Sequence, residues 1–348
     1  MSAINKILQD SLFLSSAPGT ALQKTPLGFI DIGARGGVIP DVEPLAGVTA
    51  AMAFEPDRGE SENITHNMSR NMPYARFHVA PCAVGRENGS ASMNLYETPS
   101  NNSFFAVNRR VADRYNIKTF VECGTQSVPT TNLDTYLFEK LGDEGHWGEM
   151  LKLDTQGMEF GILEGAQRTL AERTVAIIAE VEFFRMYNDQ PLFSEVEQLL
   201  RSNGFAFYGF TKMSYRSRKQ MDKHTSIGRE RILWADAVFF KDPFPGGFWN
   251  KPLTDRQNYA LFSSALLLGY YDFALEVALK TWAHGEETER IKALVRNCAT
   301  APPEDAVRAL RELTQRVEAR PYLANIEIGR FIDQRRFTWD YDDVPNIE

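Results

Sequence analysis

The chain has 348 residues, of which 43% are hydrophobic and 24% are charged, a composition typical of a folded globular protein rather than a disordered or collagen-like chain. The formal net charge of -8 disfavours broad attraction to nucleic-acid phosphates, so no nucleic-acid partner is expected. No apolar run approaches the roughly 20 residues that cross a bilayer, and the mean hydropathy is -0.33, so no transmembrane segment is expected.

The first residues lack the basic, apolar and small-residue segments of a secretory signal, so we expect a cytoplasmic location. We interpret residues 1–26 as an N-terminal arm whose apolar residues pack on the domain that follows. The three cysteines, Cys82, Cys123 and Cys298, are widely spaced and odd in number. This pattern argues against a disulfide framework and against a zinc ribbon.

Short apolar runs alternate with helix-like stretches from Gly28 to Asp242, which is typical of a parallel sheet covered by helices. The candidate strands are residues 28–32, 50–54, 75–79, 150–153, 175–181, 206–210 and 232–240. A helix is predicted over residues 191–203, with Gly204 as its C-terminal stop. The last two strands are joined by a long loop, so we expect them to be antiparallel neighbours. The predicted fold class is α/β, with a seven-stranded, mostly parallel Rossmann-like sheet.

The turn-rich segment from Asp242 to Gly247 predicts a domain boundary. Beyond it, helices are predicted over residues 260–282 and 304–317. The expected domains are the arm (1–26), the α/β domain (27–243) and an all-helical C-terminal domain (250–348). The helical domain shows no catalytic signature, and closure over a substrate, homo-oligomer formation and docking of a partner enzyme all stay open.

The strand predicted over residues 28–32 contains Asp31 and leads into a turn of small residues, Gly33 to Gly37, that lets the backbone approach a ligand closely. About 20 residues later the next strand ends at Glu55 and Pro56, where a doubly wound sheet holds ribose hydroxyls with an acid. The spacing G-x-G-x-x-G is absent because Arg35 occupies the second glycine position. This favours S-adenosylmethionine over a dinucleotide, whose pyrophosphate needs that glycine.

Asp154 and Glu180 follow at the carboxyl ends of neighbouring predicted strands, where open α/β sheets bind ligands. Three functions stay open for them: holding the amino group of the cofactor, acting as general base on a hydroxyl, or binding a divalent metal. The structural alternative is that Asp154 caps the next helix and Glu180 pairs with an arginine. No spacing signature requires a metal, and none is predicted.

The loop between the last two predicted strands is basic and includes Arg216, Arg218 and His224. It could capture an anionic substrate, such as a phosphorylated or nucleotide-linked sugar, and His224 is a candidate catalytic base. The alternative is a solvated loop without a binding function.

The segment from Gly28 to Phe240 resembles the FkbM family of methyltransferases, a branch of the class I S-adenosylmethionine-dependent fold. The first motif resembles D-x-G-A-N-x-G with Arg35 in place of Asn, and the longest resembles L-K-x-D-x-E-G-x-E with Gln156 in place of Glu. The similar blocks are residues 31–37, 54–56, 81–85, 101–103, 131–134, 151–159 and 177–180.

The resemblance implies a class I methyltransferase sheet, S-adenosylmethionine as cofactor, and O-methylation of a sugar, a glycan or a glycosylated natural product. Two alternatives stay open: a methyltransferase acting on a small metabolite, lipid or protein side chain, and a non-catalytic glycan-binding or scaffold module. The candidate cofactor-binding residues are Asp31, Gly33, Ala34, Arg35, Gly37, Glu55, Pro56, Ala83 and Asp154. The candidate catalytic residues are Asp154, Glu180 and His224. The candidate substrate-binding residues are Asn102, Ser103, Arg216 and Arg218.

Overall fold

The computed structural model describes residues 7, 10–142, 145–218, 220, 230–300 and 303–334. The chain forms two compact units. The larger consists of Ile4–Arg216 and Ile232–Ala299, and the smaller contains the C-terminal residues from Thr300 onward. No helix among the described residues is long and apolar enough to span a bilayer.

A seven-stranded sheet forms the centre of the larger unit, with the strand order β3-β2-β1-β7-β8-β10-β9. The strands are β1 (Leu27–Ile32), β2 (Thr49–Phe54), β3 (Arg76–Ala80), β7 (Met150–Leu153), β8 (Ala176–Glu182), β9 (Ala206–Arg216) and β10 (Arg231–Phe240). Neighbours from β3 to β8 pair in parallel, and β10 pairs antiparallel to β8. The predicted fold class is therefore confirmed, and each predicted strand overlaps an observed one.

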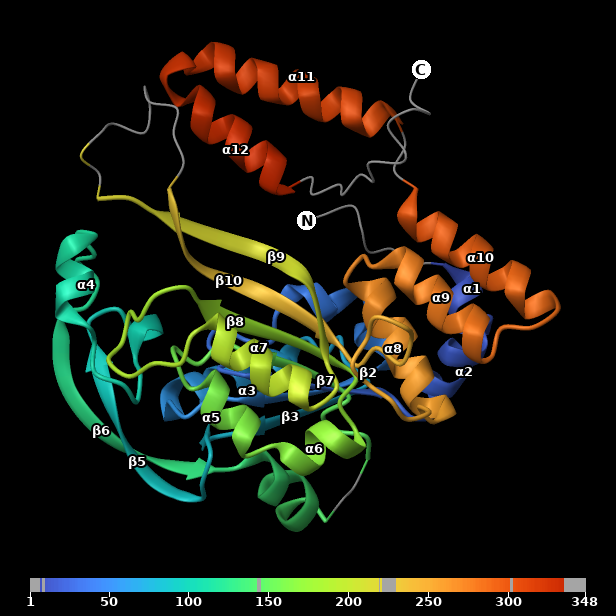
Figure 1. The fold of residues 1–348 in the computed structure, drawn as a ribbon, viewed down its shortest axis with the longest axis horizontal. Coiled ribbons are helices and arrows are strands. Elements are labelled where there is room, and N and C mark those ends of the chain that lie inside the picture. Colours follow the sequence, from blue (N-terminus) through green and yellow to red (C-terminus); the bar gives the residue numbers. More distant parts are fainter. Residues whose placement is uncertain are drawn as a thin grey trace. The chain divides into compact units, whose positions relative to one another are not determined.

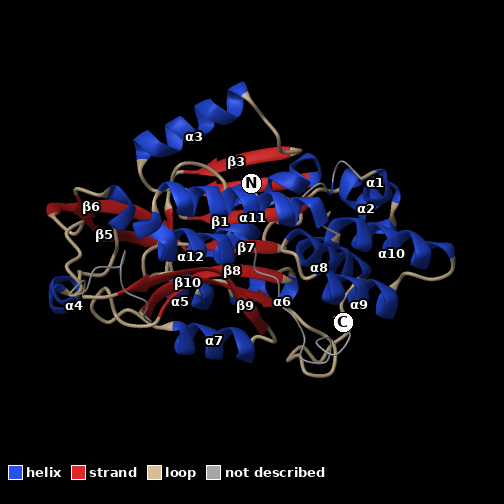
Figure 2. Ribbon diagram, turned by 90° about the horizontal axis from the view of Figure 1, so that it is seen from above, coloured by secondary structure: helices blue, strands red, loops and turns tan. Residues whose placement is uncertain are grey.

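Both faces of this sheet are buried, because successive side chains along each strand alternate between two hydrophobic clusters. Phe29 and Met150 point to one face, whereas Ile30 and Leu151 point to the other. Figure 2 shows the strands side by side, with α3 (Arg58–Arg70) next to β3 at one edge and α7 (Phe193–Ser202) next to β9 at the other.

The first face is covered by segments from both ends of the larger unit. These are α1 (Ser11–Ser15), α2 (Ala17–Lys24), η2 (Pro40–Val48), α8 (Asp255–Leu267), α9 (Tyr271–Thr281) and α10 (Glu286–Ala299). Thr254 starts α8, because its hydroxyl accepts a hydrogen bond from the Gln257 N–H. Helices α8 to α10 thus share one hydrophobic core with the sheet, and the domain boundaries at 243 and 250 stay predictions.

The second face is covered by short helices that follow β6 and β7, and by α7. They are η4 (Thr135–Lys140), α5 (Glu159–Glu164) and α6 (Gln167–Glu172). Helix α7 stops before Gly204, whose φ of +86° suits glycine, as predicted from the sequence. The motif residues singled out in the sequence lie at or just beyond the carboxyl ends of β1, β2, β7 and β8.

A second sheet of three strands, β4-β6-β5, is inserted between β3 and η4 and was not expected from the sequence. Its strands are β4 (Ala83–Val84), β5 (Gly89–Tyr96) and β6 (Glu122–Thr131). The connection from β5 to β6 carries η3 (Pro99–Asn101) and α4 (Arg109–Arg114), and α4 lies at one end of this sheet (Figure 1).

The smaller unit contains α11 (Pro303–Ala319), η5 (Pro321–Leu323) and α12 (Ala324–Gln334). The buried Glu327 of α12 joins the two longer helices, because Nε of Arg316 in α11 lies 3.1 Å from its Oε2. The helix predicted over residues 304–317 is α11.

Candidate functional site

The turn after β1 fits closely against the end of β7. Gly33 has a φ of +88°, and a Cβ atom there would lie 2.0 Å from the carbonyl oxygen of Asp154. Both Gly33 N–H and Ala34 N–H donate to the Phe54 carbonyl at 3.1 Å. Only glycine fits at position 33, and the turn draws the ends of β1, β2 and β7 together.

The same turn borders open space at Gly36 and Gly37. Their φ angles are +84° and +111°, and nothing lies within 4 Å of a Cβ atom built at either residue. The Gly36 N–H donates to Glu60 Oε1 at 2.9 Å. A ligand can therefore approach this backbone more closely than it could approach residues with side chains.

Asp31 is fully buried between this turn and β7. Its Oδ2 accepts a hydrogen bond from the Ile39 N–H at 2.9 Å, and its Oδ1 lies 3.7 Å from Lys152 Nζ. Burial raises the pKa of Asp31 to about 6, although the Lys152 charge opposes this rise. Among the residues that the structure describes, none donates a hydrogen bond to Oδ1, which is left as an acceptor.

Glu55 is buried at the end of β2, and its Oε1 accepts a hydrogen bond from the Asp57 N–H at 2.8 Å. Burial raises the pKa of Glu55, and the nearby Arg35 opposes this rise. Arg35 itself lies 3.4 Å from Asp57, from Nη2 to Oδ2. Pro56 lines a cavity of about 780 Å³ between α3 and β6. The side chain of Ala83 packs instead in a small hydrophobic cluster.

Lys152, Asp154 and Glu180 form the charged centre of the site. Lys152 Nζ lies 3.1 Å from Asp154 Oδ2, so the two side chains form an ion pair. Burial opposes ionisation of Asp154, but Lys152 outweighs it and lowers the pKa of Asp154. Glu180 is buried, and burial together with the Asp154 charge holds its pKa well above the usual range. Of the two acids, Asp154 is therefore the one that loses its proton more readily.

Gln156 links these two acids. Its Nε2 lies 3.0 Å from Glu180 Oε2 and 3.3 Å from Asp154 Oδ1. Asp154 therefore pairs with Lys152 and does not cap the next helix. The hydrogen-bond partner of Glu180 is an amide rather than an arginine. Ser103 also reaches this turn, because its Oγ donates to the Gln156 carbonyl at 2.7 Å. Asn102 faces away from it, and its Oδ1 accepts a hydrogen bond from the Tyr96 N–H at 2.9 Å.

Three further acids lie near this centre. Glu182 is two residues beyond Glu180 in β8, and burial, followed by the Glu159 charge, raises its pKa to about 8. Glu159 begins α5 and accepts hydrogen bonds from the N–H groups of Thr155 and Gly157. Asp236 pairs with Glu180 in the antiparallel register of β10 and β8.

Sequence reasoning missed Asp236 and Tyr187. A single acid within the apolar strand predicted over 232–240 was a usable signal for Asp236. Tyr187 comes from a loop, and no local pattern pointed to it.

The structure does not bring the whole candidate set together. Arg216 ends β9 in the larger unit, whereas Arg218 is exposed and belongs to the smaller unit. His224 lies outside the described residues. In the part of the chain that the structure describes, no group of three or more histidine, cysteine or acidic residues has the arrangement of a metal site.

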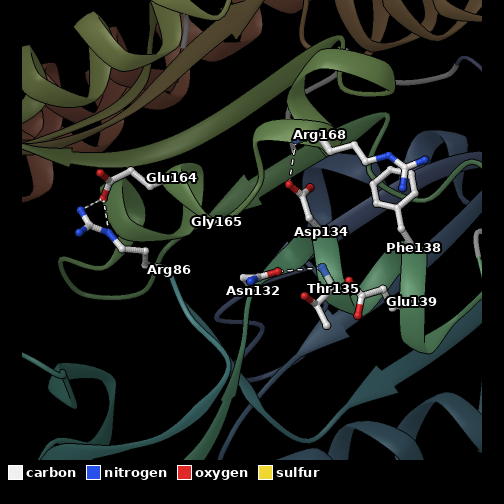
Figure 3. A pocket seen from close by; sticks show the side chains of 9 residues that line it. All are labelled: Arg86, Asn132, Asp134, Thr135, Phe138, Glu139, Glu164, Gly165 and Arg168. Carbon is white, nitrogen blue, oxygen red and sulfur yellow. Dashed lines mark hydrogen bonds and ion pairs between the residues drawn. The ribbon is translucent and has the colours of Figure 1, made fainter.

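A separate pocket of about 250 Å³ lies near the start of η4 and between α5 and α6 (Figure 3). Arg86 forms an ion pair with Glu164 on one side of it. Asp134 accepts hydrogen bonds from the N–H groups of Arg168 and Thr169, both at 2.8 Å, at the start of α6. The similar block at residues 131–134 therefore has a structural explanation, because Asp134 caps α6.

Comparison with models of protein families identifies one family. A family model described as the methyltransferase FkbM domain matches residues 31–207. No curated protein matches the chain.

Three solved structures are similar to the chain. The methyltransferase FkbM from Methylobacillus flagellatus KT is 14% identical with a TM-score of 0.36, over 62% of this chain and 43% of that one. The chain thus spans less than half the length of that protein. Magnesium protoporphyrin IX methyltransferase (ChlM) from Synechocystis PCC 6803, solved with bound SAM, is 9% identical with a TM-score of 0.32. The match covers 65% of this chain and 78% of that one. Precorrin-6y C5,15-methyltransferase from Geobacter metallireducens GS-15 is 9% identical with a TM-score of 0.32. The match covers 67% of this chain and 93% of that one.

Proposed function

Because this chain belongs to the FkbM methyltransferase family, we propose that it is an S-adenosylmethionine-dependent O-methyltransferase acting on a hydroxyl of a sugar, a glycan or a glycosylated natural product. One observation carries the proposal. The glycine turn, Glu55 and the Asp154–Glu180 pair meet at one edge of the sheet, where the Asp154 N–H donates to the Ile32 carbonyl at 3.0 Å. Open α/β sheets bind their ligands outside the carboxyl ends of such strands.

The residues at this edge fit S-adenosylmethionine. The open space at Gly36 and Gly37 would accept the cofactor against the backbone. The Glu55 carboxylate would accept hydrogen bonds from the two ribose hydroxyls, as acids at this position of a doubly wound sheet do. The accessible Asp154 carboxylate would accept hydrogen bonds from the amino group of the methionine part, and the fully buried Asp31 would support the turn beside it through its bond from the Ile39 N–H. When bound, the cofactor supplies a methyl group already activated by a sulfonium, so the protein mainly has to position the reactants.

Asp154 is the proposed base. Its side chain is 35% exposed, so a substrate hydroxyl can reach it, whereas Glu180 is buried. The Lys152 ammonium keeps Asp154 ionised, and an ionised carboxylate can accept the hydroxyl proton as the methyl group is transferred. The pKa of Glu180 is raised by burial and by the Asp154 charge, so Glu180 holds its proton to a higher pH than Asp154 does.

The proposed substrate contacts are assigned from the polar and charged groups of their side chains. Ser103 Oγ holds the Gln156 turn in place, and the neighbouring Asn102, whose Oδ1 accepts a hydrogen bond from the Tyr96 N–H, is the second proposed contact. Arg216 and Arg218 carry the fixed positive charge that suits a phosphorylated or nucleotide-linked sugar. His224 stays a candidate base from the sequence.

Methyl transfer to a panel of substrates tests this function. The purified full chain is incubated with methyl-labelled S-adenosylmethionine and neutral sugars, sugar phosphates, nucleotide sugars, lipids or peptides, and S-adenosylhomocysteine release is measured. We expect release above the substrate-free background with a sugar, and its loss in Asp154→Asn. Release with lipids or peptides alone would contradict the sugar assignment.

A further inference from the structure

The side chain of Gln156 lies between two carboxylates where β7 and β8 end. Its amide nitrogen is within 3.3 Å of Asp154 Oδ1 and within 3.0 Å of Glu180 Oε2. A side-chain amide carries two N–H groups on one nitrogen, so it can donate to both acids at once. Gln156 is thus the group that connects the proposed base to its neighbouring acid.

Tyr187 faces the other end of this amide. Its hydroxyl lies 3.1 Å from Gln156 Oε1 and 2.9 Å from the Asn101 carbonyl oxygen, and it has one hydrogen to share between the two. Tyr187 is 1% exposed, so this contact is shielded from water. The oxygen end of the amide therefore points to Tyr187, and the nitrogen end points to the acids.

The backbone of Gln156 is held in an unfavourable conformation. Its φ is +57°, in the left-handed region that non-glycine residues seldom adopt. The hydrogen bond from the buried Ser103 to its carbonyl, at 2.7 Å, fixes this conformation from a distant loop. Such strain persists where the surrounding structure determines the position of the residue.

Charged groups surround the pair on several elements. On β1, β7 and β10 they are Asp31, Lys152 and Asp236. On α5, β8 and the loop after β8 the titratable groups are Glu159, Glu182 and Tyr187. Lys152 is the one cation among these groups, and it contacts Oδ2 of Asp154, whereas Gln156 contacts Oδ1. The amide of Gln156 is the donor that serves both acids without adding charge.

We propose that Gln156 is a positioning residue whose amide holds Asp154 and Glu180 together and, through its hydrogen bond to Asp154 Oδ1, supports the negative charge that Lys152 stabilises on Asp154. This inference rests on the proposed function only in assigning the pair to accept the substrate proton.

Carboxyl titration tests the inference without cofactor or substrate. The full chain is labelled with ¹³C at the carboxyl carbons of aspartate and glutamate, and the signals are assigned from their loss in Asp154→Asn and Glu180→Gln. In Gln156→Met, which keeps the side-chain length but donates no hydrogen bond, the Asp154 midpoint should rise by about one pH unit. In Gln156→Glu a third carboxylate lies beside the pair, so the rise should be larger.

Gln167→Leu is the matched control, because its amide donates to the Leu163 carbonyl at 2.7 Å rather than to an acid. It should leave the Asp154 midpoint unchanged. Should Gln156→Met fail to fold, the nearly isosteric Gln156→Glu carries the test. Unchanged midpoints in a folded Gln156→Glu would overturn the inference. Failure of the wild-type protein to bind S-adenosylmethionine would instead overturn the proposed function, while the titration result would stand.

Discussion

The Arg256 guanidinium and the Glu149 carboxylate make two contacts of 2.6 Å, one through Nε and one through Nη2. Glu149 is buried directly before β7 and also accepts a hydrogen bond from the Gly28 N–H at 2.9 Å. Arg256 lies in α8 and donates to the Thr25 and Pro26 carbonyls at 2.7 and 2.9 Å. This single pair joins β1, β7 and α8, so it fixes the base of the sheet whose other edge carries the site.

Arg256→Met should therefore strongly destabilise the protein. It leaves the buried Glu149 without its cation, and breaking such a pair costs about 3–5 kcal/mol. Urea denaturation followed by circular dichroism measures the change. Lys292→Ala removes an exposed pair with Glu289 in α10 and should cost less than about 1 kcal/mol. Equal losses in the two variants would mean that the buried pair does not hold α8 to the sheet.

Gly33→Ala should destabilise the protein more than Gly37→Ala. Both residues have a positive φ, which costs an alanine about 1–2 kcal/mol. Only at position 33 does the new Cβ also collide with a backbone atom, the Asp154 carbonyl oxygen, and overpacking adds about 1–3 kcal/mol. Thermal denaturation of both variants tests the order. A Gly33→Ala protein as stable as Gly37→Ala would contradict the observed approach of the β1 turn to β7.

Glu182 should make the protein less stable as the pH rises. Its pKa is raised from 4.5 to about 8, chiefly by burial, so the folded protein keeps a proton that the unfolded chain has released. The free energy of unfolding should fall across this pH range, by at most about 1.4 kcal/mol per pH unit for one group.

Glu182→Gln should flatten this dependence, which urea denaturation at several pH values measures. Glu172→Gln, at an exposed position of α6 paired with Arg168, serves as the control and should keep the wild-type slope. A slope in Glu182→Gln as steep as in the wild-type protein would show that another group causes it.

The main sheet was predictable because each of its strands contains a short apolar run, although β9 continues beyond its predicted end at residue 210 to Arg216. The strand predicted over 150–153 has the bounds observed for β7, Met150–Leu153. The second sheet was not predictable, because β5 and β6 carry mostly exposed side chains and β6 contains Pro129. These strands are held by pairing with each other and have no periodic apolar face for a pattern to detect.

The site was predictable where it depends on strand ends and not where it depends on loops. Asp154 and Glu180 were expected on neighbouring strands, and β7 and β8 are paired in parallel. The contact of Tyr187 with Gln156 could not be foreseen, because it joins a loop after β8 to the turn after β7. Asp236 lies beside Glu180 only through the register of β10, which depends on residues far apart in sequence.

Calorimetric titration with S-adenosylmethionine and, separately, S-adenosylhomocysteine tests the central claim most directly. The wild-type protein should bind both, Glu55→Gln should bind them about tenfold more weakly or worse, and Glu172→Gln should bind like the wild type. Absence of binding by the folded wild-type protein, or equal binding by Glu55→Gln, would contradict the assignment of this sheet edge as the cofactor site.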